Sequence, residues 1–207
     1  GIVGYGNMGG AHARSLLDGN VEEMELVALC DIDEARIEAA KQDFEKEQKD
    51  ASKVEYFVDY KDMVAKAALD VVLIAVPHYL HPEIAIYCFE NGLNVITEKP
   101  AGVYTKQVEE MNEAAKKSGK LFGIMYNQRT NPIYQKVREM IKNGELGQLK
   151  RSVWMITNWY RPQCYYDQGS WRASWAGEGG GVLINQCPHN LDLWQWMVGM
   201  PSKIKGF

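Results

Sequence analysis

The sequence has no dense stretch of Lys and Arg, no long apolar run and no closely spaced pair of cysteines. A surface that binds nucleic acid needs clustered cations to displace the counterions of the phosphates. Here the formal net charge is −4, and acidic and basic residues mix along segments such as residues 34–50, a pattern typical of a solvated helix face. The sequence therefore predicts no nucleic-acid partner.

The sequence also gives little support to a membrane protein or to a disulfide- or zinc-stabilised scaffold. No apolar run approaches the roughly 18 residues needed to span a bilayer, and no signal peptide is visible. The four cysteines form no CxxC pair, which disfavours a structural zinc site and a small disulfide framework. We expect no membrane partner, no metal and a reducing, cytoplasmic location. The cysteines are Cys30, Cys88, Cys164 and Cys187.

Both ends of the chain look cut. It opens at Gly1 with only "GIV" before its first motif, and it stops at "PSKIKGF", which resembles the start of a strand. We therefore expect this chain to be a piece of a longer protein, lacking part of its C-terminal domain.

Residues 1–123 alternate short β-branched runs with amphipathic helical stretches. Strands that are apolar on both faces and separated by helices predict a doubly wound parallel sheet covered on both sides. The expected strands are "GIVG", "ELVALCD", "VEYFV", "DVVLIAVP", "LNVITE" and "KLFGIMY". The expected helices are "GGAHARSLLDG", "DEARIEAAKQDFEKEQ", "YKDMVAKA", "PEIAIYCFENG" and "TKQVEEMNEAAKKSG".

Residues 124–207 no longer alternate short apolar strands with helices, and they predict the start of a second α/β domain. A helix is expected from Pro132 to about Gly144, and "LKRSVWMITNWY" alternates like a strand with one wet face. A loop rich in Trp, Tyr and Gly follows, and "PHNLDLWQWMV" predicts a further helix. There are no internal repeats.

Three glycines near the start have the spacing of a dinucleotide-binding turn. Gly4, Gly6 and Gly9 follow the G-x-G-x-x-G pattern between an expected strand and an expected helix. Such a turn lets the backbone approach a pyrophosphate, and the helix N-terminus offers free N–H groups and partial positive charge. A glycine turn in some other α/β fold is the alternative.

Asp31 supports the dinucleotide interpretation, because it ends the second strand where a carboxylate accepts hydrogen bonds from an adenosine ribose. A 2′-phosphate would place negative charge beside Asp31 and Asp33, so the sequence favours NAD over NADP. Arg36, about one helical turn further on, is the residue that would reverse this preference.

Two further segments carry candidate chemistry. Lys99 follows the fifth strand at the carboxyl edge of the sheet, where open α/β folds bind ligands, although a surface lysine in a loop is the alternative. In "GGGVLINQCPHNLD", His189 is a proton-transfer residue, a metal ligand with Cys187, or an ordinary histidine near a helix start.

Taken together, "GYGNMG", the strand ending in Asp31, "VPHYLHPE", "EKPAG" and "GGGVLINQCPHNLD" resemble the Gfo/Idh/MocA family of dehydrogenases. The resemblance covers essentially the whole chain. It implies a Rossmann domain followed by an α/β domain with a large open, mainly antiparallel sheet, which usually carries the contact of a homo-oligomer. Most of that sheet would lie beyond residue 207.

The resemblance also implies roles for the two candidate residues. Lys99 becomes the catalytic lysine that hydrogen-bonds the reacting oxygen. His189 becomes the general acid/base that exchanges a proton with the substrate hydroxyl, which suits an imidazole with an unperturbed pKa of about 6.5.

The chain departs from the family at one catalytic position. Many members carry Asp four residues before the histidine, whereas this chain has Asn185, which cannot accept a proton or hold negative charge. Either His189 and Lys99 suffice, or another acid compensates, or the activity is altered. Asp192 is a candidate for that acid, or simply a polar residue on the helix.

The remaining expected site residues follow the fourth and sixth strands. Pro77 and His78 are expected to flank the cofactor, whereas His81 fits a structural role better than a catalytic one. Arg129 either anchors the chain or contacts an anionic group. The expected cofactor-binding residues are Gly4, Tyr5, Gly6, Asn7, Met8, Gly9, Asp31, Ile32, Arg36, Val76, Pro77, His78, His81, Glu98, Lys99 and Asn127.

Aromatic residues gather between positions 154 and 175. Such faces suit a sugar or cyclitol, whose C–H groups stack while Asn158 or Arg161 binds the hydroxyls; filling the core or a subunit interface is the alternative. We expect Trp171 or Trp175 to touch ligand. The expected substrate residues are Lys99, Gln128, Asn158, Trp171, Trp175, Asn185 and His189.

The leading functional hypothesis is an NAD(P)-dependent oxidoreductase acting on a secondary alcohol or ketone of a sugar or cyclitol. One alternative is a glycosidase that uses tightly held NAD for transient oxidation of its sugar. Another is a non-catalytic, cofactor-sensing regulator on the same fold, although both Lys99 and His189 are present.

Overall fold

The computed structural model describes residues 1–157, 160–167, 169 and 171–206. The chain divides into two compact units, Gly1–Met125 and Tyr126–Phe207. Within the described residues, no helix is both long enough and apolar enough to cross a membrane.

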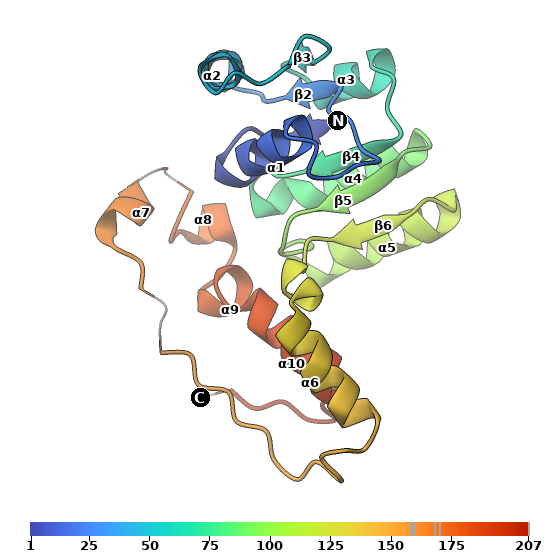
Figure 1. Ribbon diagram of the computed structural model, residues 1–207, viewed down its shortest axis with the longest axis vertical. Coiled ribbons are helices and arrows are strands. Elements are labelled where there is room, and N and C mark those ends of the chain that lie inside the picture. Colours follow the sequence, from blue (N-terminus) through green and yellow to red (C-terminus); the bar gives the residue numbers. More distant parts are fainter. Residues whose placement is uncertain (158–159, 168, 170, 207) are drawn as a thin grey trace. The chain divides into compact units, whose positions relative to one another are not determined.

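The first unit is built on a six-stranded sheet in which every neighbouring pair of strands is parallel (Figure 1). Its strand order is β3-β2-β1-β4-β5-β6, which confirms the predicted doubly wound sheet. The strands are β1 Ile2–Val3, β2 Ala28–Cys30, β3 Glu55–Phe57, β4 Val71–Ile74, β5 Asn94–Thr97 and β6 Phe122–Ile124. The helices are α1 Asn7–Leu17, α2 Glu34–Lys46, α3 Tyr60–Lys66, η1 His78–Leu80, α4 His81–Glu90 and α5 Thr105–Ser118.

Two hydrophobic clusters show which helices cover which face of this sheet. Successive strand residues point to opposite faces, and Ile2 and Val3 accordingly belong to different clusters. Ile2 packs with Ala13 of α1 and Phe44 of α2. Val3 shares its cluster with residues of α3, α4 and α5, such as Met63. Both faces are therefore covered, which is why the central strands β1, β2 and β4 are apolar throughout.

Local sequence signals set the helix ends. Asp33 caps α2 by accepting a hydrogen bond from the backbone N–H of Ala35, and Asp59 caps α3 in the same way. Gly119 closes α5 in the left-handed conformation, as its position in the sequence predicts. By contrast, Gly6 at the N-cap of α1 offers no side-chain hydrogen bond. The first backbone N–H groups of α1 are thus uncapped by a side chain.

The second unit is helical in its described part. It contains η2 Asn127–Thr130, α6 Pro132–Lys142, α7 Gln163–Asp167, α8 Trp175–Glu178, α9 Val182–Asn185 and α10 Pro188–Val198. Helices α6 and α10, both predicted, pack side by side (Figure 1). Asn131 caps α6, where Pro132 fits the first turn.

The prediction of a strand over residues 149–160 is wrong for the residues that the structure describes. No strand is assigned in residues 149–157, while 158 and 159 lie outside the described residues. A strand is defined by pairing with a neighbour, and an alternating sequence without such a neighbour stays unpaired. The antiparallel sheet expected in this domain is correspondingly not seen among the described residues of the unit.

Candidate functional site

The glycine turn between β1 and α1 has the geometry that a pyrophosphate site requires. Gly4 has φ +99°, and a Cβ there would lie 2.6 Å from the carbonyl oxygen of Ala75. A Cβ on Gly9 would overlap the carbonyl oxygen of Gly4, so the helix can approach the strand only with glycine there. At Gly6 the nearest heavy atom to a Cβ is 3.7 Å away. The first two glycines after the strand thus have different roles. Gly4 allows a tight turn, whereas Gly6 leaves the backbone open to the approach of a pyrophosphate.

The strand order reverses next to this turn. The chain runs from β1 to β2 on one side of β1, whereas β4 lies on its other side. Open α/β folds bind ligands outside the carboxyl ends of the strands at such a reversal. The N-terminus of α1, with Asn7 and the half-exposed Met8 in its first turn, opens at the same edge.

Asp31 follows β2 and is tied to the glycine turn. Its Oδ2 accepts a hydrogen bond from the backbone N–H of Tyr5 at 2.7 Å, and its Oδ1 accepts from the backbone N–H of Asp33 at 3.0 Å. Two such bonds hold a nearly buried carboxylate in a fixed orientation. Each carboxylate oxygen keeps a lone pair with which it can accept a further hydrogen bond from a hydroxyl group.

The side chain of Tyr5 points away from the turn. Its hydroxyl donates to Asp43 at 3.0 Å, and its ring packs edge-on against Phe44. Burial, with a smaller contribution from Asp43, raises the pKa of Tyr5 to about 12. Tyr5 therefore contributes to the turn through its backbone alone.

Ile32 and Arg36 stand beside Asp31. Ile32 is 91% exposed although it is a large apolar residue, so it offers a surface on which an aromatic ring could lie. The guanidinium of Arg36 donates to the carbonyl oxygen of Tyr5 at 3.3 Å and is 3.8 Å from a carboxylate oxygen of Asp33. Its charge is thus partly balanced by Asp33.

The segment after β4 includes two buried histidines. His81 is completely buried, with Nδ1 2.7 Å from the carbonyl oxygen of Pro100 and Nε2 2.8 Å from that of Val76. Burial lowers the pKa of His81 despite these two contacts. His81 therefore joins the loops that follow β4 and β5. His78 is nearly buried beside it, and Pro77 is exposed.

Glu98 and Lys99 follow β5. Glu98 is almost buried; its Oε1 lies 2.8 Å from Nε2 of His12 on α1, and its Oε2 accepts from the backbone N–H of Lys99 at 3.2 Å. The Lys99–Pro100 peptide bond is cis. Sequence reasoning missed His12, although its place three residues after Gly9, on the same side of the helix, was a usable signal. The pair connects α1 to the end of β5.

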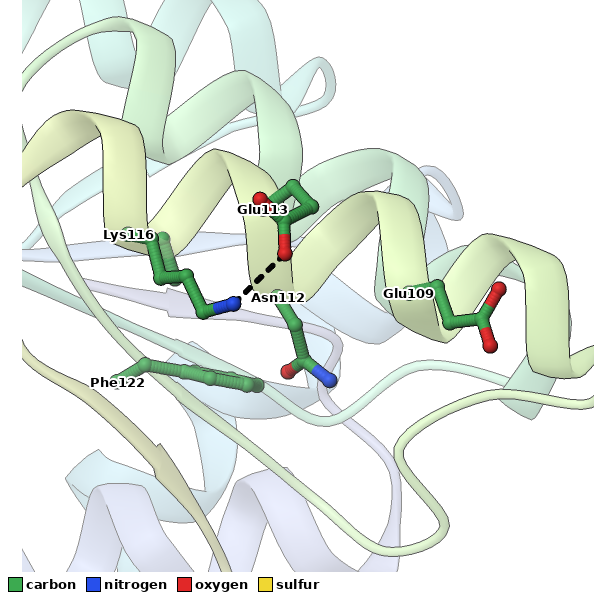
Figure 2. A pocket seen from close by; sticks show the side chains of 6 residues that line it. Glu109, Asn112, Glu113, Lys116 and Phe122 are labelled. Carbon is green, nitrogen blue, oxygen red and sulfur yellow. Dashed lines mark hydrogen bonds and ion pairs between the residues drawn. The ribbon is translucent and has the colours of Figure 1, made fainter.

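A shallow pocket of about 370 Å³ lies elsewhere on the first unit (Figure 2). It is lined by α5 residues such as Glu109 and Lys116 and by Phe122 at the start of β6. Lys116 is bound to Glu113 at 2.7 Å. Ligands of doubly wound sheets bind at the carboxyl ends of the strands, whereas Phe122 begins its strand. This pocket is therefore not the cofactor site, and it contains no residue predicted for that site.

In the second unit, Arg129 and Asp192 form a two-pronged ion pair. Nε of Arg129 donates to Oδ2 of Asp192 at 2.8 Å, and a terminal nitrogen donates to Oδ1 at 2.5 Å. The bond to Asp192 raises the pKa of Arg129. Arg129 therefore anchors η2 to α10, and Asp192 is engaged in this pair. Asn127 is exposed and Gln128 half-buried in the same turn.

Removing this ion pair is expected to destabilise the fold. Arg129→Ala leaves Asp192, whose side chain is 9% exposed, without its cation, and should lower the free energy of unfolding by about 1–3 kcal/mol. Lys136→Ala, which breaks the exposed contact with Glu139, is the control and should cost under about 1 kcal/mol. Urea denaturation of both variants measures the difference. Equal effects would contradict an anchoring role.

His189 occupies the second position of α10, half-buried. Its ring packs edge-on against Tyr126, with ring centroids 6.1 Å apart. Burial, with a further contribution from Asp192, raises the pKa of Tyr126, so this neighbour stays neutral. Lys99 belongs to the first unit and His189 to the second.

Asn185 is the last residue of α9 and is buried. Its Nδ2 donates a hydrogen bond to Oε1 of Glu178, the equally buried last residue of α8. Sequence reasoning did not single out Glu178, because a lone glutamate before a glycine run carries no motif.

The aromatic loop is partly described. Trp175 is 79% exposed, whereas Trp171 is half-buried beneath the guanidinium of Arg172, 4.5 Å from its ring centroid. Arg172 also lies over Tyr165 and donates to its hydroxyl at 2.5 Å. Asn158, one of the expected substrate residues, and Trp159, an aromatic residue of the same loop, lie outside the described residues.

Two of the four cysteines, Cys30 and Cys88, are buried in the first unit. Burial raises the pKa of Cys30 and of Cys88 to about 12, which keeps both as thiols. Among the residues that the structure describes, no three His, Cys, Asp or Glu side chains are grouped to hold a metal ion.

Comparison with protein families matches both units. Residues 1–126 match an oxidoreductase family with an NAD-binding Rossmann fold, GFO/IDH/MocA, and residues 134–207 match the GFO/IDH/MocA C-terminal domain.

Several individual relatives are named as dehydrogenases. Inositol 2-dehydrogenase of Salmonella typhimurium is 32% identical over 149 residues, 72% of this chain and 42% of its own length. The scyllo-inositol 2-dehydrogenase (NADP(+)) IolW of Bacillus subtilis is 27% identical over 99% of this chain and 52% of its own. The crystal structure of the WlbA dehydrogenase from Bordetella pertussis, in complex with NADH and UDP-GlcNAcA, has a TM-score of 0.80 at 28% identity, covering 96% of this chain and 58% of that one. The chain spans about half the length of the curated relatives it matches.

Proposed function

Because this chain belongs to the Gfo/Idh/MocA oxidoreductase family, we propose that its first unit binds NAD and that the protein oxidises a secondary alcohol of a sugar or cyclitol, or reduces the corresponding ketone. The observation that carries the proposal is the hydrogen bond between the glycine turn and the carboxylate of Asp31. Glycine is required at Gly4 and Gly9 by backbone geometry, and the carboxylate beside the turn is held by the backbone N–H of Tyr5.

The residues of the turn fit a dinucleotide. The uncapped N-terminus of α1 offers backbone N–H groups and partial positive charge to a pyrophosphate. Asp31 would accept hydrogen bonds from the ribose hydroxyls, and the exposed face of Ile32 would receive the adenine ring. Val76, Pro77 and His78, which follow β4, would flank the cofactor between the glycine turn and Lys99.

We favour NAD over NADP. A 2′-phosphate would lie against Asp31, whose oxygens are fixed by backbone N–H groups, and Asp33 adds negative charge nearby. Arg36 is the cation that could reverse this preference, and it already contacts Asp33. The relative IolW is named as an NADP(+) enzyme, which makes the cofactor a question for direct measurement.

Bound NAD supplies a hydride acceptor at C4 of its nicotinamide ring. The chain's own residues supply binding and proton transfer. Lys99 hydrogen-bonds the reacting oxygen with its ammonium group, and its backbone is fixed by Glu98. His189 in its neutral form takes the proton of the substrate hydroxyl during oxidation and returns it during reduction. Asn185 orients the substrate through its amide.

The proposal includes assembly and location. Val153, Met155 and Ile156 expose apolar side chains in the segment expected to form a strand. Exposed apolar groups of this kind mark surfaces that another element or subunit covers. We propose that another part of the full-length protein covers these side chains, that the open sheet of the C-terminal domain carries a homo-oligomer contact, and that the protein is cytoplasmic.

A panel of polyols and sugars with NAD and with NADP, followed by the absorbance of the reduced cofactor, tests the proposal on the full-length protein. We expect accumulation of NADH with a cyclitol or sugar, and weaker activity with NADP. Asp31→Ser should narrow the gap between the cofactors, since it removes the charge that repels a 2′-phosphate. Turnover of a glycoside without net NADH would instead identify the redox glycosidase. Binding of NADH without any turnover would identify the regulator.

A further inference from the structure

Two buried polar side chains face each other across the glycine run of the second unit. Glu178 ends α8 and Asn185 ends α9, each 5% exposed, with the glycines 179–181 between the helices. A buried carboxylate is stabilised only where hydrogen bonds replace the water it has lost. The amide of Asn185 supplies one such bond to Oε1 of Glu178.

This contact fixes the orientation of the amide. A carboxylate only accepts hydrogen bonds, so the NH₂ end of Asn185 must face Glu178. Its Oδ1 then points away from Glu178 as an acceptor in a set direction. An asparagine on the surface could rotate its amide, whereas this one is held by a buried charge.

We propose that Glu178 is a positioning residue of the substrate site. It holds Asn185 so that Oδ1 accepts a hydrogen bond from a substrate hydroxyl, and it supplies negative charge to a position where the side chain at 185 carries none. The inference rests on the proposed function, because it assigns Asn185 to the substrate. It goes beyond that function in naming the residue that makes asparagine suitable there.

The same geometry predicts that aspartate does not suit position 185 in this chain. An aspartate there would put a second carboxylate against the buried one of Glu178, and two carboxylates in contact cannot both stay ionised. One of the two pKa values would rise. Glu178 with Asn185 therefore forms a matched pair with one negative charge, and exchanging only one member breaks the match.

Thermal unfolding tests the pairing without any need for activity. Four full-length proteins are compared: wild type, Asn185→Asp, Glu178→Gln, and the double variant. Asn185→Asp alone should lower the midpoint by roughly 4 °C at about pH 8 and by less at about pH 5, where one carboxylate is protonated. In this variant one carboxyl group has a higher pKa in the folded state than in the unfolded state. The folded state therefore holds its proton more tightly, and the stability of the variant falls as the pH rises. Adding Glu178→Gln to that variant should restore the midpoint, since the new amide can donate a hydrogen bond to the new carboxylate.

Kinetics test the positioning role. At about pH 8, Asn185→Asp should lower kcat/KM for the polyol on the order of tenfold, and the double variant should recover most of it. The Kd for NADH should not change in any of the four proteins. Glu178→Gln alone keeps an acceptor for the amide but loses the charge, so its pH profile should shift. Glu139→Gln, an exposed residue of α6, is the control and should alter neither quantity.

The outcomes separate this inference from the proposed function. Additive effects of the two substitutions on the midpoint, at both pH values, overturn the pairing. Coupled midpoints with unchanged polyol kinetics in every variant overturn the positioning role. Absence of NADH binding in the wild type overturns the proposed function instead, while the unfolding data still report on the pair.

Discussion

Lys99→Ala and His189→Asn are each expected to lower kcat by about 10²–10⁴-fold in the full-length protein, the range in which positioned proton-transfer groups contribute. Lys99→Ala removes the cation that binds the reacting oxygen. His189→Asn removes the group that accepts the hydroxyl proton, while keeping a polar side chain in the second position of α10. Stopped-flow or steady-state absorbance of the reduced cofactor measures both.

These two variants need controls for folding and for cofactor binding. Their Kd for NADH, measured by fluorescence titration, should stay close to that of the wild type, because most of the proposed cofactor contacts come from the glycine turn and Asp31, which neither substitution changes. Leu191→Ala changes an exposed residue of the same helix as His189 and should leave kcat unaltered. Near-normal turnover in Lys99→Ala or in His189→Asn would remove that residue from the catalytic set.

Gly9→Ala is expected to weaken NADH binding by about ten- to a hundredfold. The added Cβ overlaps the carbonyl oxygen of Gly4, so α1 must move away from β1, at a cost of about 1–3 kcal/mol. That movement displaces the helix N-terminus on which the pyrophosphate is proposed to bind. Fluorescence titration with NADH gives the affinity, and circular dichroism shows whether the variant is folded.

Gly10→Ala is the matched control for this prediction. It places the same methyl group one residue further along α1, where the nearest atoms lie 3.5 Å away in ordinary contact. Alanine also favours a helix over glycine by about 0.5–1 kcal/mol, so the control should be at least as stable as the wild type. Full NADH affinity in a folded Gly9→Ala protein would show that the close approach of α1 is not needed for binding.

The first unit was predictable because its signals are local. Short apolar runs rich in β-branched residues, such as residues 71–74, indicate buried strands, and Gly119 marks the end of its helix in the sequence. Parallel strands buried on both faces then leave a small set of topologies. The dinucleotide turn was predictable for the same reason, since Gly4, Gly6 and Gly9 lie within one motif.

The predictions were weaker where structure depends on a distant partner. Residues 149–157 alternate as a strand does, yet they form none, because a strand also needs a neighbour with which to pair. Asp192 was considered as a replacement acid from its spacing to His189. Its carboxylate instead binds Arg129, which is 63 residues away in the chain.

The sequence by itself determined the elements of the first unit and the motif residues that a cofactor would require, because these follow from hydrophobic period and from spacing over a few residues. Only the tertiary structure decided which polar side chains meet. His12 binds Glu98 across 86 positions, and Asn185 turns to Glu178 rather than to any acid that spacing suggested. The spacing after Gly9 could have drawn attention to His12, but it does not identify Glu98 as its partner, because that contact depends on where the folded backbone brings the two side chains together.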